Sequence, residues 1–213
     1  FFNYSKQPPF MHYGVVDKDD NLVHYTPIPL PGPRLPHDMA FTSNYSILND
    51  LPLFWDEEML KRNIHATKLH DLPSRFAIIP RFGSVKDIKW FEANPTYCLH
   101  WNNAYEIGDE VIVEGYFQEN PEPGNYEGAP RGLERMMAFL DNHLLKPRLH
   151  RWRFNLKTGE TIETIRHHHP TSRNCWRSGV RSEPVVGSFG EFRCADPYAV
   201  DGINGANGTV SYY

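Results

Sequence analysis

Eleven histidines among 213 residues make a metal site the first chemistry to consider. Two of them occupy positions from which a rigid scaffold could direct an imidazole inward. His37 follows a proline-rich connector, and His100 lies within a strand expected over residues 97–105. Apolar and aromatic neighbours flank both residues, and such surroundings favour the neutral imidazole that binds a divalent metal. His37 and His100 are therefore the candidate metal ligands.

A structural role is the competing interpretation of these two histidines. A histidine in an apolar strand is more often a hydrogen-bonded core residue than a ligand. The separation of His37 and His100 along the chain matches no metal-binding spacing. The residues alone leave both interpretations open.

The other histidines predict no second metal site. The triplet at 167–169 has the composition of a metal tract. Adjacent residues of a strand point to opposite faces, however, so three in a row rarely share one ion. A surface position is expected for the histidines beside polar or turn residues, namely His12, His24, His65, His70, His143 and His150.

Signatures of other enzyme classes do not occur in the sequence. It has no nucleophile elbow, phosphate loop, dinucleotide fingerprint or HExxH motif. The acidic residues at 56–58, Glu119 and Glu122 fall at an expected helix start or in loops. We therefore expect them to be solvated surface charges rather than the paired carboxylates of a glycosidase.

Composition indicates a globular protein, with 40% hydrophobic and 14% aromatic residues. The net charge of −4 and the absence of a basic cluster argue against a nucleic-acid partner. No apolar run approaches the roughly 18 residues of a membrane span, which leaves peripheral membrane contact open. Cys98, Cys175 and Cys194 are odd in number and far apart. They predict no disulfide framework, and a cytoplasmic location is expected.

The elements that must position the histidines are short strands separated by turns. Polar, turn-forming residues between β-rich runs predict four hairpins. Their paired runs are 10–16 with 22–28, the two halves of 39–53, 97–105 with 110–117, and 148–156 with 160–165. The further elements expected are strands at 1–5, 76–80 and 88–92, a short helix within 55–66, and an amphipathic helix or loop over 132–145.

Many short strands with little helix predict an all-β fold, and a sandwich, a barrel and a propeller all remain open. The prolines of residues 27–36 predict an extended connector. Alternation ends after residue 165. Residues 166–213 are therefore expected to form a divergent, irregular tail.

Residues 31–42, PGPRLPHDMAFT, resemble a signature of the carotenoid cleavage oxygenase family. That family also includes stilbene-cleaving dioxygenases and a retinoid isomerase. Residues 99–106, LHWNNAYE, resemble its second histidine strand. Further matching segments follow family order, at 12–17, 51–54, 75–81, 90–92 and 148–159. The resemblance covers residues 1–165 and indicates an internal fragment of such an enzyme.

The resemblance implies a partial seven-bladed β-propeller, comprising several blades with short helical insertions. It also implies Fe(2+) held by four histidines, two of them His37 and His100, with glutamates orienting the imidazoles. The implied reaction uses O2 to split a C=C double bond of a carotenoid, apocarotenoid or stilbene into two carbonyl products.

Two departures from the family pattern qualify these expectations. The family's first and last ligand histidines have no counterpart between residues 1 and 213, so this chain alone is expected to hold iron weakly and show little activity. Glu191, in a Glu-Phe pair that comes later than the family pattern places it, is a candidate orienting glutamate. The alternatives are an inactive truncated propeller that binds a terpenoid at most, and an isomerase or hydrolase use of the same fold.

Overall fold

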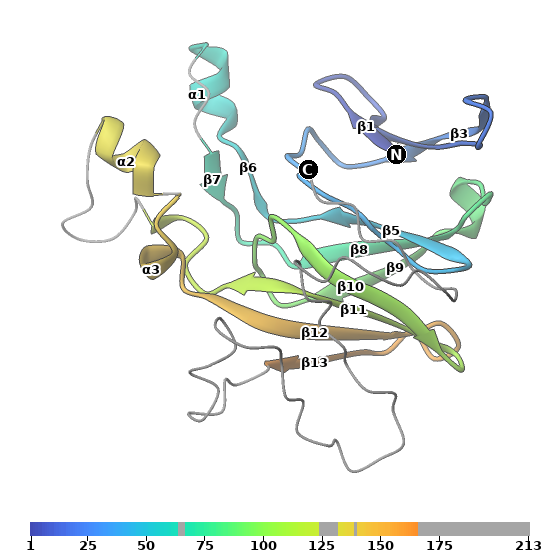
Figure 1. Cartoon of the computed structure of the whole chain (residues 1–213). Helices are drawn as coiled ribbons and strands as arrows, with labels where there is room; N and C mark the ends of the chain where they lie inside the picture. Colours follow the sequence, from blue (N-terminus) through green and yellow to red (C-terminus); the bar gives the residue numbers. More distant parts are fainter. Residues whose placement is uncertain (64–66, 124–131, 139, 166–213) are drawn as a thin grey trace, which may run out of the picture. The chain divides into compact units, whose positions relative to one another are not determined.

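A computed structural model describes the strand-rich part of the chain (Figure 1). The described residues are 1–63, 67–123, 132–138 and 140–165. They belong to one compact unit, Phe1–His167. All neighbouring strands within a sheet pair antiparallel. None of the described helices is long and apolar enough to cross a membrane.

The first sheet has the order β1-β2-β3, formed by Phe2–Tyr4, Phe10–Val16 and Leu22–Pro29. The predicted hairpin is confirmed, with Tyr13 opposite Thr26. In β2, Met11 and Tyr13 are buried while Phe10, His12 and Val15 are half-buried. This alternation follows from the two-residue period of side chains along a strand.

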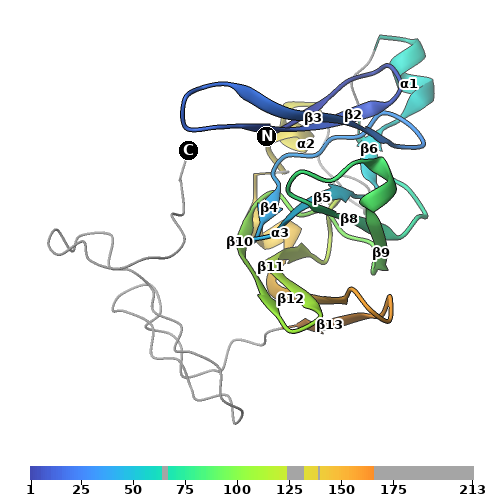
Figure 2. The same ribbon diagram turned by 90° about the vertical axis from the view of Figure 1, so that its right-hand side faces the viewer.

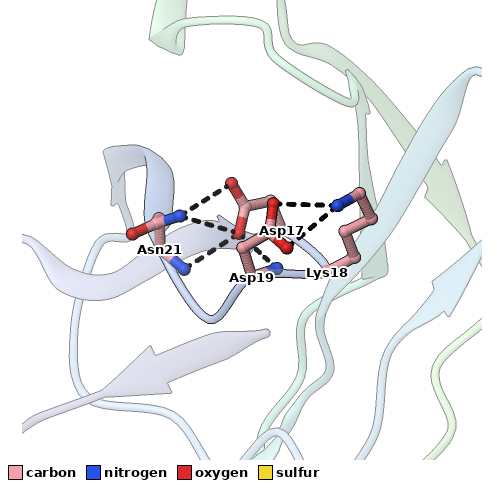
Figure 3. A network of polar contacts seen from close by, with 4 residues as sticks. All are labelled: Asp17, Lys18, Asp19 and Asn21. Carbon is pink, nitrogen blue, oxygen red and sulfur yellow. Dashed lines mark hydrogen bonds and ion pairs between the residues drawn. The ribbon is translucent and has the colours of Figure 1, made fainter.

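The tip of the β2–β3 hairpin is closed by polar side chains (Figure 3). The Asp17 carboxylate accepts hydrogen bonds from the amides of Asp19 and Asn21, each at 2.9 Å. These bonds, that of Asn21 first, lower the pKa of Asp17. Lys18 pairs with Asp19 at 2.9 Å, and both side chains are well exposed. The carboxylates of Asp17 and Asp19 therefore accept local hydrogen bonds at a solvent-exposed turn.

The second sheet has the order β4-β5-β8-β9, formed by Ala40–Phe41, Tyr45–Asp50, Ser74–Pro80 and Lys89–Ala93. Strand β4 carries the chain onward from the proline-rich connector. The hairpin expected between the two halves of 39–53 is confirmed near its start: it turns at Ser43 and Asn44, and Ala40 pairs with Ile47 across that turn.

An insertion separates β5 from β8. It consists of β6 (Leu53–Trp55), the expected short helix α1 (Glu57–Lys61) and β7 (Thr67–Leu69). Strands β6 and β7 form a two-stranded sheet of their own, which the sequence pattern did not predict. A single turn of 3-10 helix, η1 (Val85–Asp87), precedes β9.

The third sheet has the order β10-β11-β12-β13, formed by Trp101–Ile107, Glu110–Gln118, Pro147–Asn155 and Thr161–Ile165 (Figure 2). Two short helices, α2 (Leu133–Ala138) and α3 (Asn142–Leu145), lie between β11 and β12. The β12–β13 hairpin turns at Gly159, whose φ of +79° is a conformation that glycine adopts readily.

Two apolar clusters join the three sheets. The larger cluster includes Ile47, Phe76, Phe91, Val111, Val113, Trp152 and Phe154, from the second and third sheets. The smaller includes Met11, Tyr13, Ile28, Leu48, Ala77 and Ile79, from the first and second. Burying one such side chain contributes about 1.5–3 kcal/mol. Sheets of sequential antiparallel strands that pack on their chain neighbours are the arrangement expected of propeller blades.

Candidate metal centre

The two candidate ligands lie together although they are far apart in the chain. Ring centroids of His37 and His100 are 5.1 Å apart, and the ring planes meet at 79°. His37 lies in the connector before β4, and His100 is the residue immediately before β10. The expectation that His100 lies mid-strand is therefore wrong. Both imidazoles instead project from loops that lead into strands.

Both imidazoles are exposed, and the His100 side chain keeps 64% of its accessible surface. An imidazole nitrogen binds a first-row divalent metal at about 2.0–2.1 Å. The centroids of two imidazoles on neighbouring positions of one ion are therefore roughly 4.5–5.5 Å apart. The observed 5.1 Å falls within that range, so the separation of the two rings is compatible with a shared metal ion.

Asp38 links the two histidine segments. One carboxylate oxygen, Oδ1, accepts the amide of Met39 at 2.8 Å, and the other, Oδ2, accepts the amide of Trp101 at 3.1 Å. Oδ2 also lies 4.0 Å from Nδ1 of His100, beyond hydrogen-bonding distance. Sequence reasoning did not single out Asp38. Its position directly after His37 was the available signal.

The connector that carries His37 is anchored by a buried ion pair. Arg34 donates from Nε to Asp50 at 2.5 Å, and both side chains are less than 10% exposed. Arg75 binds the other oxygen of Asp50 at 3.0 Å. The Arg34 guanidinium also lies over the Phe54 ring, 3.8 Å from its centroid. A charged group buried with full pairing resists displacement, because breaking the pair strands a charge.

The loop that carries His100 is held by the hydroxyl of half-buried Tyr97 and by the thiol of buried Cys98. Burial raises the pKa of Tyr97 to about 12, and its hydroxyl donates to the Leu35 carbonyl at 2.8 Å. Burial likewise raises the pKa of Cys98 to about 12, and its Sγ donates to the His100 carbonyl at 3.2 Å. Cys98 is therefore a thiol near neutral pH, which does not ligate metals as a thiolate does.

Gly115 in β11 makes room for Trp101. A Cβ atom at this position would lie 2.7 Å from the Trp101 ring and 3.0 Å from Cys98 Sγ. Trp101 and Gly115 are paired across β10 and β11. The glycine thus allows the residue after His100 to lie close against the sheet.

Comparison with known proteins gives the chain its family. Residues 1–200 match the family model described as RPE65, retinal pigment epithelial membrane protein. The chain belongs to the RPE65 family of carotenoid cleavage oxygenases. The resemblance seen in the histidine motifs is confirmed.

Relatives of this family member include enzymes from plants and bacteria. It is 36% identical over 165 residues to a carotenoid 9,10(9',10')-cleavage dioxygenase of Crocus sativus, covering 74% of this chain and 28% of the relative. It is 30% identical over 153 residues to isoeugenol monooxygenase of Pseudomonas putida, covering 70% and 30%. The chain thus spans about a third or less of the length of these relatives.

Solved structures in the family confirm the fold. Lignostilbene dioxygenase of Pseudomonas brassicacearum superposes with a TM-score of 0.59 at 24% identity, covering 77% of this chain and 34% of that one. Cobalt-substituted ACO of Synechocystis gives 0.57 at 18%, covering 73% and 32%. The expected all-β, partial β-propeller is therefore the fold of this family member.

The other histidines of this carotenoid cleavage oxygenase relative do not all lie at the surface. His143 is exposed as expected, and His12, His24 and His70 are half-buried. His150 is buried, which contradicts the expected surface position. Its Nε2 lies 3.0 Å from Glu163, and its ring stacks on Phe117. His65 lies outside the described residues.

Glu163 is half-buried and accepts two hydrogen bonds. Burial works to raise its pKa, but the bonds from His150 and from the Asn94 amide outweigh burial and lower the pKa. The His150–Glu163 hydrogen bond joins β12 to β13 in the third sheet. Among the described residues it forms no common metal-binding group with His37 and His100. Glu122 is also buried, at 9% exposure, and accepts the Leu69 amide, so its expected solvation is wrong.

Among the described residues, no group of three or more His, Cys, Asp or Glu side chains is arranged around one point. His37 and His100 form a pair there. The 167–169 triplet and Glu191 lie outside the described residues, as does the tail expected over 166–213. The orienting role of Glu191 stays a prediction.

Proposed function

We propose that this chain carries part of the iron centre of a dioxygenase that cleaves a C=C double bond, with His37 and His100 as two of the metal ligands. The observation that carries the proposal is the approach of the two imidazoles to 5.1 Å, from motifs 63 residues apart. Family membership supports it, as does the cobalt-substituted structure of a family relative.

The donor set suits Fe(2+) or a similar divalent ion. Imidazole nitrogen is a good ligand for iron, cobalt and zinc, and both rings are exposed to an incoming ion. In a neutral imidazole one ring nitrogen carries the proton and the other presents its lone pair to a metal, so each ring can supply one ligand atom.

Bound Fe(2+) would supply O2 activation, and the reaction places one oxygen atom on each carbon of the broken double bond. The substrate class is a carotenoid, apocarotenoid or stilbene, in keeping with relatives named for carotenoid and lignostilbene cleavage. The residues of this chain hold the two imidazoles in place and leave their outer side open. Any further ligands come from outside the described residues.

Metal uptake tests the ligand assignment. The full 213-residue chain is titrated with Co(2+), a spectroscopically visible substitute for Fe(2+), alongside His37→Ala and His100→Ala. In all chains the 167–169 triplet is replaced by glutamine, because a histidine tract can bind metal independently. Parent uptake of about one equivalent that either alanine variant abolishes supports the assignment. Equal uptake by all three chains overturns it.

Product analysis tests the reaction. The chain with Fe(2+) and O2 is incubated with an apocarotenoid and with a hydroxylated stilbene, and carbonyl products are quantified. Because two imidazoles hold iron more weakly than the four that the family implies, we expect slow turnover and loss of the products in His100→Ala. A spectral shift of the ligand without any product would favour a terpenoid-binding remnant instead.

A further inference from the structure

The residues that follow the two histidines are joined to each other. Asp38 follows His37 and Trp101 follows His100. The Trp101 amide donates to the Asp38 carboxylate at 3.1 Å, and the Trp101 indole nitrogen donates to the Asp38 carbonyl at 3.4 Å. Each histidine is therefore one peptide bond away from a two-point link between the segments.

The link between Asp38 and Trp101 is also hydrogen-bonded to the second sheet. Asn49, which is buried in β5, donates from its side-chain amide to the Asp38 carbonyl at 2.8 Å. The Met39 amide donates to the remaining carboxylate oxygen at 2.8 Å. One residue thus accepts four hydrogen bonds, from the connector, from β5 and from the start of β10.

We infer that Asp38 is a positioning residue that sets the distance between the His37 and His100 imidazoles. The inference rests on the proposed function, because it assigns the purpose of the pair to metal binding. Hydrogen bonds to an ionised carboxylate are stronger than neutral ones, so this acceptor fixes the two backbones firmly. The only remaining freedom of the two imidazoles is then rotation about their side-chain torsions.

Substitution of Asp38 separates the hydrogen bonds of its side-chain carboxylate from those of its backbone carbonyl. Asp38→Ala deletes both acceptor oxygens while the backbone carbonyl still accepts Asn49 and the indole. Asp38→Asn is nearly the same shape but offers one acceptor oxygen, so it satisfies either the Met39 or the Trp101 amide. Loss of residues that orient metal ligands typically costs roughly 10- to 100-fold in affinity. We expect Asp38→Ala to lie near the upper end and Asp38→Asn near the lower.

Asp20→Asn is the matched control. It removes the same charge from the β2–β3 hairpin tip, where the φ of +63° is one that asparagine accepts. Co(2+) affinity of this variant should equal that of the parent. Far-ultraviolet circular dichroism and thermal unfolding of each chain establish that it is folded before binding is measured.

A metal-free measurement accompanies the titration. Rings in a T-shaped contact should give a nuclear Overhauser cross-peak between the ring protons of His37 and His100 in the full chain. We expect the cross-peak in the parent and Asp20→Asn, and its loss in folded Asp38→Ala. If that variant unfolds, Asp38→Asn gives the same comparison with a weakened cross-peak.

The outcomes are distinct for the two proposals. Retention of the cross-peak and of Co(2+) affinity in both Asp38 variants would overturn the positioning role and leave the proposed function standing. Loss of the cross-peak in Asp38→Ala, with no Co(2+) bound through the histidines even in the parent, would overturn the ligand assignment. The positioning role would stand in that case.

Discussion

His100 and His150 both follow a leucine in aromatic-rich sequence, yet the fold places them in opposite environments. The His100 imidazole is exposed. Its backbone is held by the Cys98 thiol, which donates to the His100 carbonyl, and by Asp38, which accepts the amide of the next residue. The His150 imidazole is buried, with 3% of the residue exposed; its ring stacks on Phe117, contacts the tilted Trp152 ring and is hydrogen-bonded to Glu163. His100 therefore combines a fixed backbone with an exposed ring that can bind a ligand. The ring of His150 is instead packed and hydrogen-bonded within the protein.

This contrast shows what distinguishes a candidate ligand from a structural histidine. A ligand must keep a lone pair that no protein donor or neighbour occupies, while its loop must not move. At His37 and His100 the rigidity comes from Arg34, Asp50 and Asp38. At His150 it comes from the imidazole itself.

Asp50→Ala should be the most damaging substitution, because it leaves the buried Arg34 guanidinium without its partner. The unfolding free energy should fall by about 3–5 kcal/mol in urea denaturation. The matched control is Asp19→Ala, which breaks an exposed pair with Lys18 and should cost less than about 0.5 kcal/mol. Similar losses in both variants would show that the connector is not anchored through Asp50.

His150→Ala should destabilise the chain by about 3 kcal/mol, because it leaves a cavity and removes a hydrogen bond from Glu163. His150→Phe keeps an aromatic ring against Phe117 and Trp152, so it should recover part of that loss. Thermal and urea unfolding measure both. Co(2+) affinity should stay at the parental value in each folded variant, and a drop would mean that the two histidine environments are coupled.

The hairpin pattern predicted the strand pairing around His150 correctly but not the burial of its side chain. The β12–β13 turn at Gly159 was expected from its residues, and it pairs His150 with Ile165 and Trp152 with Glu163. These pairs put His150 and Glu163 on one face, so their contact was within reach of the sequence. His150 was instead expected at the surface because polar residues lie beside it in the sequence.

His100 shows where local pattern fails. Alternating residues at 97–105 predicted a strand through His100, but β10 begins at Trp101. Residues 96–101 find several of their hydrogen-bond partners in distant segments. The Thr96 amide donates to the Ser74 hydroxyl at 3.0 Å, and the Trp101 amide donates to Asp38. Such bonds depend on the packing of two sheets and have no signature in a short window of sequence.

The family motifs supplied what periodicity could not. Spacing alone left His37 and His100 open between core and ligand, and the motifs around them selected the ligand interpretation. The approach of their rings to 5.1 Å agrees with that choice. The β6–β7 pair went unpredicted because three-residue strands are too short for an alternating pattern to be visible.

Glu163→Gln should have an intermediate effect that depends on pH. The folded-state pKa of Glu163 lies below its ordinary 4.5, so the charged form stabilises the fold above that pH. This contribution is lost as pH falls through the folded-state pKa. At pH 7 the variant should be less stable by about 1–2 kcal/mol. Urea unfolding from pH 7 to pH 3 should show the difference shrinking, and a difference that grows on acidification would contradict the assignment.

His37→Ala and His100→Ala should have the smallest effect on stability. Both rings are exposed, and the hydrogen bonds of their loops come from Asp38, Tyr97 and Cys98, which the substitutions leave intact. Exposed substitutions of this kind change the unfolding free energy by less than about 0.5 kcal/mol. The same variants should abolish Co(2+) uptake. A side chain that contributes almost nothing to folding and nearly everything to metal binding is available for function, as His150 is not. A loss above about 1 kcal/mol would instead place these imidazoles among the structural histidines.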